Sequence, residues 1–380
     1  MSHHETKSLG GRLLTTTFMV AVALIIVMGI LLVKRFGMGL GAVTNMNDGY
    51  AWGLWIAYDV LVGTAFACGG FAMALLVYIF NKGEYHPLVR PAILTSVFGY
   101  TLAGVSIFFD IGRYWQFYNI ILPWHVNFNS VMAEVALCIL SYVVVLWIEF
   151  TPAVAEGLGQ KNTTRTLNKV MFVFIGLGVL LPTMHQSSLG TLMVIAGQKL
   201  SPLWQTNLLP VLFLISAITM GYSIVVFESL LSSSAFKRPL ETGMLAKLSG
   251  VIPWLLVVYL GIRFGEILLN GKMGYAFSFD LRGNMFLLEN ILYIVPAVLL
   301  FPKQKRTNPG TLFMAAFLIL IAGSMYRFDT YLVGFDPGPG WRYFPSASEI
   351  LITLGVISVE VIGYLIFVKK FPVLPKLGHA

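Results

Sequence analysis

Charged residues are scarce in this sequence: aspartate, glutamate, lysine and arginine together make up 11% of the 380 residues. Soluble domains carry about 25% charged residues. Hydrophobic residues supply 57% of the chain, and the mean hydropathy is +0.80. This deficit of charge argues against a soluble protein and predicts that most of the chain faces lipid or other apolar helices. The net charge of +8 contains no long basic run, so it indicates positive cytoplasmic loops rather than a nucleic-acid site.

Cysteine and histidine are also rare, which limits the cofactors. Cys68 and Cys138 are the only cysteines, whereas an iron–sulfur cluster needs about four. Apart from the terminal histidines, only His86, His125 and His185 are present, too few for a multi-haem cytochrome. A single haem between His125 and His185 stays open as an alternative. Because nucleotide-binding and metal-binding motifs are absent too, we expect no haem, metal or iron–sulfur cluster in this chain, and a partner that supplies electrons.

Long apolar runs dominate what is present. They are continuous rather than alternating, so they predict an all-α transmembrane helical bundle, a single integral membrane domain over residues 1–380. Leu189–Ala196 is too short to span and is interpreted as a re-entrant or interfacial piece. The ten predicted spans are Leu13–Val33, Trp52–Phe80, Pro91–Phe109, Phe128–Phe150, Lys169–Met184, Leu208–Leu231, Leu248–Leu269, Met285–Phe301, Thr311–Met325 and Ile350–Val368.

The distribution of basic residues predicts the orientation. The first apolar run ends in Lys34-Arg35 without a small-residue cleavage site, so it is expected to be retained as a span. With the N-terminus inside, sixteen of the 25 lysines and arginines fall on the inner side and nine on the outer side. Cytoplasmic loops carry the excess of positive charge. The bias predicts that both termini are cytoplasmic.

Ionisable residues inside membrane spans are costly and are therefore functional candidates. Asp59 lies on a face of small residues in the second span, and Glu134 lies on a polar stripe of the fourth. Both are expected about two turns below the outer surface, roughly 10 Å deep. The third span ends with Asp110 and Arg113, and the fifth is expected to end near His185. Acidic, basic and imidazole groups are thus predicted to meet in the outer third of the membrane.

Such a site suits a quinone, since a flat apolar ring packs against aromatics while its two carbonyl oxygens need hydrogen-bond and proton donors. Aromatic residues at the predicted outer level include Tyr114, Trp115, Tyr118 and Trp124. In a purely structural interpretation, Asp110–Arg113 and Arg263–Glu266 are ion pairs within single helices, in which the two charges only neutralise each other. Glu134 has no basic residue on its own helix, which favours a functional role for it.

Several motifs resemble the NrfD/polysulfide-reductase family of membrane subunits, and the likeness covers all ten predicted spans. Within that family the chain is most similar to the membrane subunits of hydrogenase-2-type [NiFe] uptake hydrogenases. The segments that carry the resemblance are Phe66-Ala-Cys-Gly-Gly70, Tyr85-His-Pro-Leu-Val-Arg-Pro91, Asp110-Ile-Gly-Arg-Tyr-Trp115, Asn168-Lys-Val-Met171 and Leu181-Pro-Thr-Met-His-Gln-Ser-Ser-Leu-Gly190.

The resemblance implies a subunit of the bacterial inner membrane that passes electrons to menaquinone or ubiquinone, with no haem of its own. The implied partners are a periplasmic ferredoxin-like iron–sulfur subunit and the small and large subunits of a [NiFe] hydrogenase. Proton translocation is expected to accompany turnover. The implied catalytic residues are Asp59, Tyr100, Glu134 and His185; the expected quinone-binding residues are Asp110, Arg113, Tyr114 and His125; and the expected proton path uses Glu134, Glu228 and Glu360.

Three other functions are weighed against this one. A proton-coupled secondary transporter could use the same acidic residues, but transporters usually show inverted repeats, and none is visible here. A haem-b electron-transfer subunit is the second alternative. The third is a membrane subunit of a molybdenum oxidoreductase, which would share the family but have another catalytic partner.

Overall fold

A computed structural model of the chain describes residues 6–375 and shows a helical bundle. Within these residues, ten helical segments are long and apolar enough to cross a membrane, so the chain is a multi-pass integral membrane protein, as predicted. The spans are α1 (Thr16–Met38), Trp55–Ile79, η4–α4 (Gly83–Leu88 and Val89–Asp110), α5 (Val131–Gly157), α6 (Lys161–Ala196), α7 (Leu209–Ala235), α8–α9 (Thr242–Leu248 and Ile252–Leu269), α11 (Leu281–Leu300), α13–η7 (Pro309–Phe328 and Asp329–Val333) and α14 (Ala347–Lys370).

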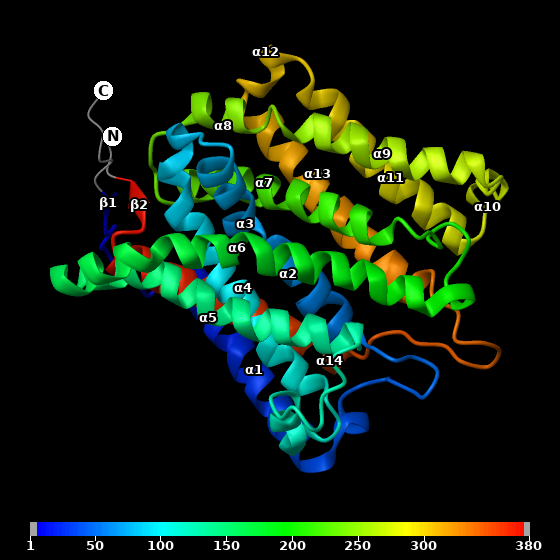
Figure 1. Cartoon of the computed structure of the whole chain (residues 1–380). Helices are drawn as coiled ribbons and strands as arrows, with labels where there is room; N and C mark the ends of the chain where they lie inside the picture. The colour runs from blue at the N-terminus through cyan, green and yellow to red at the C-terminus, as the bar shows by residue number, and fades with distance from the viewer. Residues whose placement is uncertain (1–5, 376–380) are drawn as a thin grey trace.

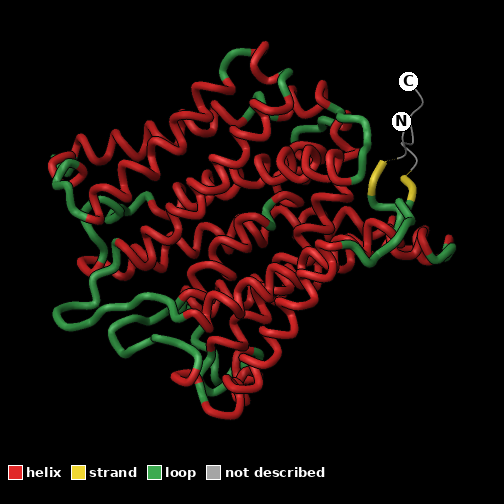
Figure 2. The backbone as a smooth tube through the Cα atoms, turned by 180° about the vertical axis from the view of Figure 1, so that it is seen from behind, coloured by secondary structure: helices red, strands yellow, loops and turns green. Residues whose placement is uncertain are grey.

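Short elements connect or end these spans. They are the strands β1 (Thr6–Lys7) and β2 (Leu374–Pro375), the 3₁₀ turns η1 (Leu40–Ala42), η5 (Tyr114–Ile120) and η6 (Gly197–Lys199), and the single helical turns α10 (Met273–Ala276) and α12 (Lys303–Arg306). Figure 2 shows that helix makes up nearly the whole tube and that the longest loops gather at one end of the bundle.

The second span, Trp55–Ile79, is irregular and the most deeply buried. It consists of the π-helical η2 (Trp55–Val62), α2 (Gly63–Phe66), α3 (Gly69–Ala74) and the π-helical η3 (Leu75–Ile79). In its most apolar window 83% of the residues are buried. π-Helical turns are rare and often mark functional sites; here η2 carries Asp59.

Small residues let the second span approach its neighbours closely, as the sequence predicts. A Cβ atom on Gly99 of α4 would lie 2.6 Å from the Cβ of Ala67. The Gly70 amide donates to Ser96 Oγ at 2.9 Å, and a Cβ on Gly221 of α7 would lie 2.5 Å from the Cys68 carbonyl oxygen. The second span is therefore wedged between α4 and α7, where a larger side chain does not fit.

The bundle has two halves that meet at the second span. In one half α4, α5 and α6 pack in sequence order; in the other α7, α9, α11 and α13 pack together. The second span contacts both halves through α4 and α6 on one side and α7 and α13 on the other. Helices α1 and α14 lie side by side and cover the first half, against α4 and the second span.

Both described chain ends lie on one face of the bundle, which we call the terminal face. Strand β1 pairs antiparallel with β2, and the Leu9 and Gly10 amides donate to the carbonyls of Val368 and Lys369. The opposite face, called the loop face, carries residues 39–54, 111–130, 197–208, 270–280 and 334–346. Its first and last loops are joined by hydrogen bonds from the Asn45 and Asn47 amides to the Phe344 and Arg342 carbonyls.

The fifth span differs from its prediction. Helix α6 runs without interruption through Pro182 to Ala196, so Leu189–Ala196 is the last part of a span and not a separate interfacial piece. The ring of Pro182 removes one amide donor and frees the Gly178 carbonyl one turn earlier, yet the helix continues. Proline is tolerated inside membrane helices where neighbouring helices and local adjustments satisfy the freed backbone group. His185 therefore lies about 16 Å from the end of α6, not at the end of the span.

Three arginines that the sequence places among the outer loop charges are buried within helices. Arg35, Arg263 and Arg327 are each at most 2% exposed. They belong to α1, α9 and α13, and their charges face the protein interior. Removing them from the outer count increases the bias of loop charge toward the terminal face.

Candidate quinone site

The middle of the first half contains a buried polar cluster built by the second span, α4 and α6. His185 Nε2 lies 3.2 Å from Thr64 Oγ1, and the amide nitrogen of Gln186 donates to the same oxygen at 3.2 Å. The Tyr100 ring stands edge-on to the His185 ring with 5.7 Å between centroids, and its hydroxyl lies 3.8 Å from Cys68 Sγ. The structure thus brings the predicted residues Tyr100 and His185 together.

Arg327 joins this cluster from the other half of the bundle. Its guanidinium donates to Gln186 Oε1 at 3.1 Å and to Ser216 Oγ at 3.2 Å. The side chain is fully buried, and none of the ion pairs among residues 6–375 includes it. A buried positive charge held only by neutral acceptors is uncommon and costly, so it marks a functional position.

Glu134 reaches the same region from the first turn of α5. Its carboxylate accepts a hydrogen bond of 2.8 Å from the hydroxyl of Ser188, which lies one turn after His185 on α6. The Glu134 side chain is half-buried and lies nearer the loop face than His185. A carboxyl group, an imidazole and a phenol therefore line one stretch of the bundle interior.

Asp59 and Asp110 form a second acidic group on another side of the second span. The Asp59 carboxylate faces Ser106 of α4 and Thr353 of α14, and the Asp110 carboxyl lies within electrostatic range of it. Asp110 ends α4 beside Arg35, whose guanidinium donates to the Phe109 and Ile111 carbonyls at 2.8 and 2.7 Å. These two carboxyl groups therefore face α1 and α14, whereas Glu134 bonds to α6 and His185 packs against the second span and α4.

The three remaining predicted quinone-binding residues lie outside these buried clusters. Arg113 and His125 are exposed on the loop between α4 and α5. None of the ion pairs among the described residues joins Arg113 to Asp110, so the alternative of an intrahelical pair is not seen. Tyr114 packs edge-on against Phe36 at 4.7 Å. Arg113, Tyr114 and His125 lie on the loop face because α4 ends at Asp110, before the segment that contains them.

Glu228 and Glu360 are brought together near the terminal face. Thr95 Oγ1 donates to Glu228 at 2.6 Å, and the charge of Glu228 is within range of Glu360. Glu228 also lines a cavity of about 240 Å³ with Arg238 and Glu241, at the terminal face. Tyr58 lies within range of both Glu360 and Asp59, so the described polar groups connect these carboxyls toward Asp59 rather than toward Glu134.

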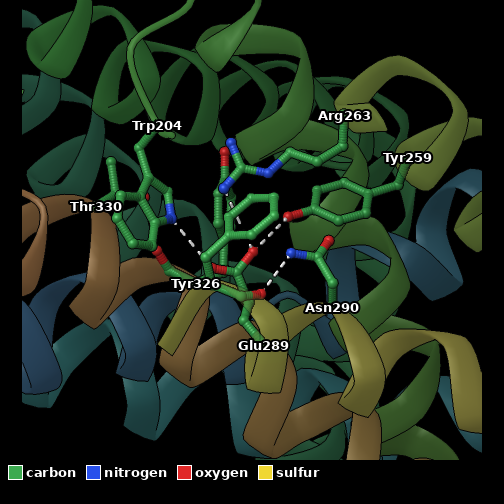
Figure 3. A network of polar contacts seen from close by, with 8 residues as sticks. Trp204, Tyr259, Arg263, Glu289, Asn290, Tyr326 and Thr330 are labelled. Atoms are coloured by element: carbon green, nitrogen blue, oxygen red, sulfur yellow. Dashed lines mark hydrogen bonds and ion pairs between the residues drawn. The ribbon is translucent and has the colours of Figure 1, made fainter. Parts of the chain in front are cut away.

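The second half contains a polar network that the sequence interpretation missed. Figure 3 shows Trp204, Tyr259 and Arg263 pointing toward the Glu289 carboxylate of α11. The Arg263 guanidinium pairs with Glu289 at 3.6 Å, and Trp204 Nε1 donates to it at 3.1 Å. The pairing of Arg263 with Glu266 within α9 is thus wrong. Periodicity on one helix cannot show it because the true partner comes from another helix.

On the loop face, Tyr343 ties the last loop to two spans. Its hydroxyl donates to Glu349 at 2.5 Å and accepts from the Leu54 amide at 2.7 Å. Burial, with Glu349 beside it, raises the pKa of Tyr343. The hydroxyl therefore stays protonated and holds the loop over the ends of the second span and α14.

Comparison with known families decides the assignment. Residues 42–333 match the family described as "Polysulphide reductase, NrfD". The chain belongs to the NrfD family. The matched region runs from η1 to the end of η7, so the NrfD match covers the second to ninth spans and leaves the packed pair α1 and α14 outside it.

Three relatives align with this NrfD-family protein over most of their length. The "Probable Ni/Fe-hydrogenase 2 b-type cytochrome subunit" (HybB) of Escherichia coli is 44% identical, over 98% of this chain and 96% of the relative. A protein of Nitratidesulfovibrio vulgaris is 32% identical, over 98% and 97%. The "Menaquinone reductase, integral membrane subunit" of the same organism is 27% identical, over 89% and 86%.

The name of the first relative contradicts the expectation that this NrfD-family chain contains no haem, since a b-type cytochrome subunit contains one. The described residues do not fit a haem held by two histidines. His185 is the one described histidine in the interior of a span, and its ring is packed between Thr64 and Tyr100. His86 lies at the terminal face and His125 at the loop face, where neither can face His185 across a haem.

Thr64, Gln186, Arg327 and Glu289 are the site residues that sequence analysis missed. Arg327 and Glu289 each interrupt an apolar run, which is a usable signal for a functional residue in a membrane. Arg327 was misplaced because its predicted span stops at Met325, whereas the helix continues through it to Phe328. Thr64 and Gln186 carry no such signal, because neutral polar residues are common within membrane helices.

Proposed function

We propose that this protein is the quinone-reactive membrane subunit of a respiratory [NiFe] hydrogenase in a bacterial inner membrane. One observation carries the proposal: in a chain 44% identical to a named hydrogenase-2 subunit, an imidazole, a phenol and a carboxyl group line one stretch of the bundle interior. These groups are His185, Tyr100 and Glu134. A quinone needs such groups to bind its oxygens and exchange its protons. The relative named menaquinone reductase supports the same substrate class.

Electrons are proposed to enter from an external ferredoxin-like iron–sulfur subunit docked on the loop face. This face is the nearer one to Glu134, and its loops expose large aromatic side chains, which are enriched in protein interfaces. Trp115, Trp124, Trp341 and Phe344 are between 44% and 78% exposed. The small and large hydrogenase subunits complete the proposed complex, and menaquinone or ubiquinone accepts the electrons.

Proton uptake from the terminal face is part of the proposal. A cavity at that face is lined by Glu228, and Glu360 lies within electrostatic range of Glu228. Tyr58 lies within range of both Glu360 and Asp59, so these groups support a path from the terminal face into the bundle. Glu134 is proposed to serve the quinone itself and not this entry path. If quinone protons come from the side opposite to hydrogen oxidation, turnover contributes to the membrane potential.

Purification of the native complex through a tag on this chain tests the proposal. We expect hydrogenase large and small subunits and an iron–sulfur subunit to co-purify, and the complex to reduce a quinone analogue with hydrogen. Removing this chain should abolish quinone reduction but leave hydrogen oxidation with an artificial dye. Co-purification of a molybdenum enzyme instead would replace the hydrogenase assignment with the third alternative, and quinone reduction without this chain would refute the quinone site.

A further inference from the structure

The hydrogen bonds around His185 have a fixed direction that begins at Arg327. A guanidinium can only donate, so the atom of Gln186 that faces Arg327 at 3.1 Å is the amide oxygen. The amide nitrogen of Gln186 therefore points the other way, toward Thr64 Oγ1 at 3.2 Å. Arg327 thus settles the orientation of this amide, which would otherwise be ambiguous.

The Thr64 hydroxyl transmits this direction to the imidazole. Its single hydrogen is donated to the Val60 carbonyl one turn earlier, at 2.6 Å, the shortest contact that this hydroxyl makes. The Thr64 oxygen is then left to accept, from Gln186 and from His185 Nε2, which also lies 3.2 Å away. Nε2 must therefore carry a hydrogen, and in the neutral ring Nδ1 is the nitrogen with a free lone pair.

The Nδ1 atom of His185 is buried and, among the described residues, has no hydrogen-bond partner. The side chain is 1% exposed. Buried nitrogen acceptors are normally paired, so an unpaired one calls for a partner that the chain itself does not supply. The Tyr100 ring stands edge-on to the His185 ring and provides an aromatic surface beside it.

Building on the proposed function, we propose that Thr64, Gln186 and Arg327 are positioning residues that hold His185 with Nε2–H bound to Thr64 and Nδ1 presented to the quinone. In quinol oxidation a quinol O–H bond breaks, the proton forms the Nδ1–H bond, and the electron pair stays on the quinol oxygen until the iron–sulfur partner removes electrons. In quinone reduction the doubly protonated ring returns that proton from Nδ1 to the reduced quinone oxygen.

This arrangement also links the two halves of the bundle. Arg327 belongs to α13, while Thr64 and His185 belong to the second span and α6. The orientation of the proton-exchanging ring thus depends on a charge from the half that does not contain His185 and Tyr100.

Substitution of Thr64 tests the proposal in the intact hydrogenase complex. Thr64→Val keeps the shape of the side chain but removes the acceptor for Nε2–H, whereas Thr64→Ser retains the hydroxyl. We expect Thr64→Val to lower kcat for a soluble quinone analogue by roughly 10- to 100-fold, as for other groups that orient a functional histidine. KM should change little, and Thr64→Ser should restore kcat to within about threefold of the native value, since its hydroxyl still orients the ring.

Thr219→Val is the matched control. Thr219 is also fully buried in a span and also donates to the carbonyl four residues earlier, at 2.7 Å, but it lies outside the His185 cluster. We expect this variant to keep the native kcat with quinone. Hydrogen oxidation with an artificial dye, which bypasses this subunit, should be native in all variants.

The outcomes separate this inference from the proposed function. If His185→Ala abolishes quinone reduction while Thr64→Val behaves like Thr64→Ser and the native complex, the positioning role is wrong. If His185→Ala itself retains full quinone reduction, the proposed quinone site is wrong. Should Thr64→Val fail to assemble, Gln186→Met removes the amide between Arg327 and Thr64, and the same fall in kcat is expected; native kcat in that variant would overturn the inference.

Discussion

Glu134 is the residue on which the proposed chemistry depends most directly. Its carboxylate accepts a hydrogen bond of 2.8 Å from the Ser188 hydroxyl, and none of the ion pairs among residues 6–375 includes it. Glu134→Gln keeps the shape and hydrogen-bonding capacity but cannot supply a proton. We expect quinone-linked hydrogen oxidation to fall by roughly a hundredfold, within the usual range for a lost proton-transfer group. Enzyme assays with quinone and with an artificial dye measure the difference.

Glu156→Gln on the same helix provides the comparison for that variant. Glu156 lies near the other end of α5 and pairs with Arg90 at 2.7 Å, where both side chains are partly exposed. Its loss should leave the quinone-linked rate unchanged. A Glu134→Gln complex with native quinone activity would remove the proposed role, and a complex that fails to assemble would indicate a structural one.

The Arg263–Glu289 pair is expected to matter for stability. Both side chains are almost fully buried, and removing Glu289 takes away the carboxylate that pairs with Arg263, with Asp329 left as the acidic group in range. Glu289→Leu should therefore destabilise the subunit by about 3–5 kcal/mol. The exposed pair Lys247–Glu84 is the control, because Glu84→Leu should cost at most about 1 kcal/mol. Thermal unfolding of the detergent-solubilised protein measures both; equal stability of the two variants would contradict the expectation.

Among the elements, the contact between α4 and the second span depends on glycine. A Cβ on Gly99 would lie 2.6 Å from the Ala67 Cβ, closer than two carbon atoms can pack. Gly99→Ala should force the helices apart and destabilise the subunit by about 1–3 kcal/mol, the usual cost of overpacking. Gly104→Ala on the same helix is the control, since its nearest neighbour would be Ile139 at 3.9 Å. Thermal unfolding of both variants measures the difference. If Gly99→Ala proved as stable as Gly104→Ala, the two helices would be able to adjust to the added methyl group.

Spans could be predicted from the sequence because an apolar run of about 20 residues has few alternatives in a bilayer. The end of α6 could not, because whether Pro182 stops a helix depends on how the neighbouring helices accommodate it. For the site, the stripe of Glu134 and the motif of His185 were visible in the sequence. The bonds that tie His185 to Arg327 were not, since they join helices far apart in the chain and only tertiary packing creates them.

For the whole molecule, the two faces can be assigned to compartments. The pairing of β1 with β2 already places both described ends on one face. Cytoplasmic loops are rich in lysine and arginine, and the terminal face carries most of these residues once the buried Arg35, Arg263 and Arg327 are removed from the count of the opposite face. We therefore predict that the terminal face is cytoplasmic and the loop face periplasmic.

Paired reporter fusions test this orientation. A reporter that is active only in the cytoplasm, fused after the C-terminal residue, should be active. The same reporter inserted after Gly338, in the loop between η7 and α14, should be inactive, because that loop belongs to the opposite face. A reporter that works only in the periplasm should give the reverse pattern. If the reversed activities were found, hydrogen oxidation would lie on the other side of the membrane, and the proposed entry of protons through Glu228 would be from the periplasm. Equal activity at both positions would be incompatible with a membrane crossing by α14, the one span between them.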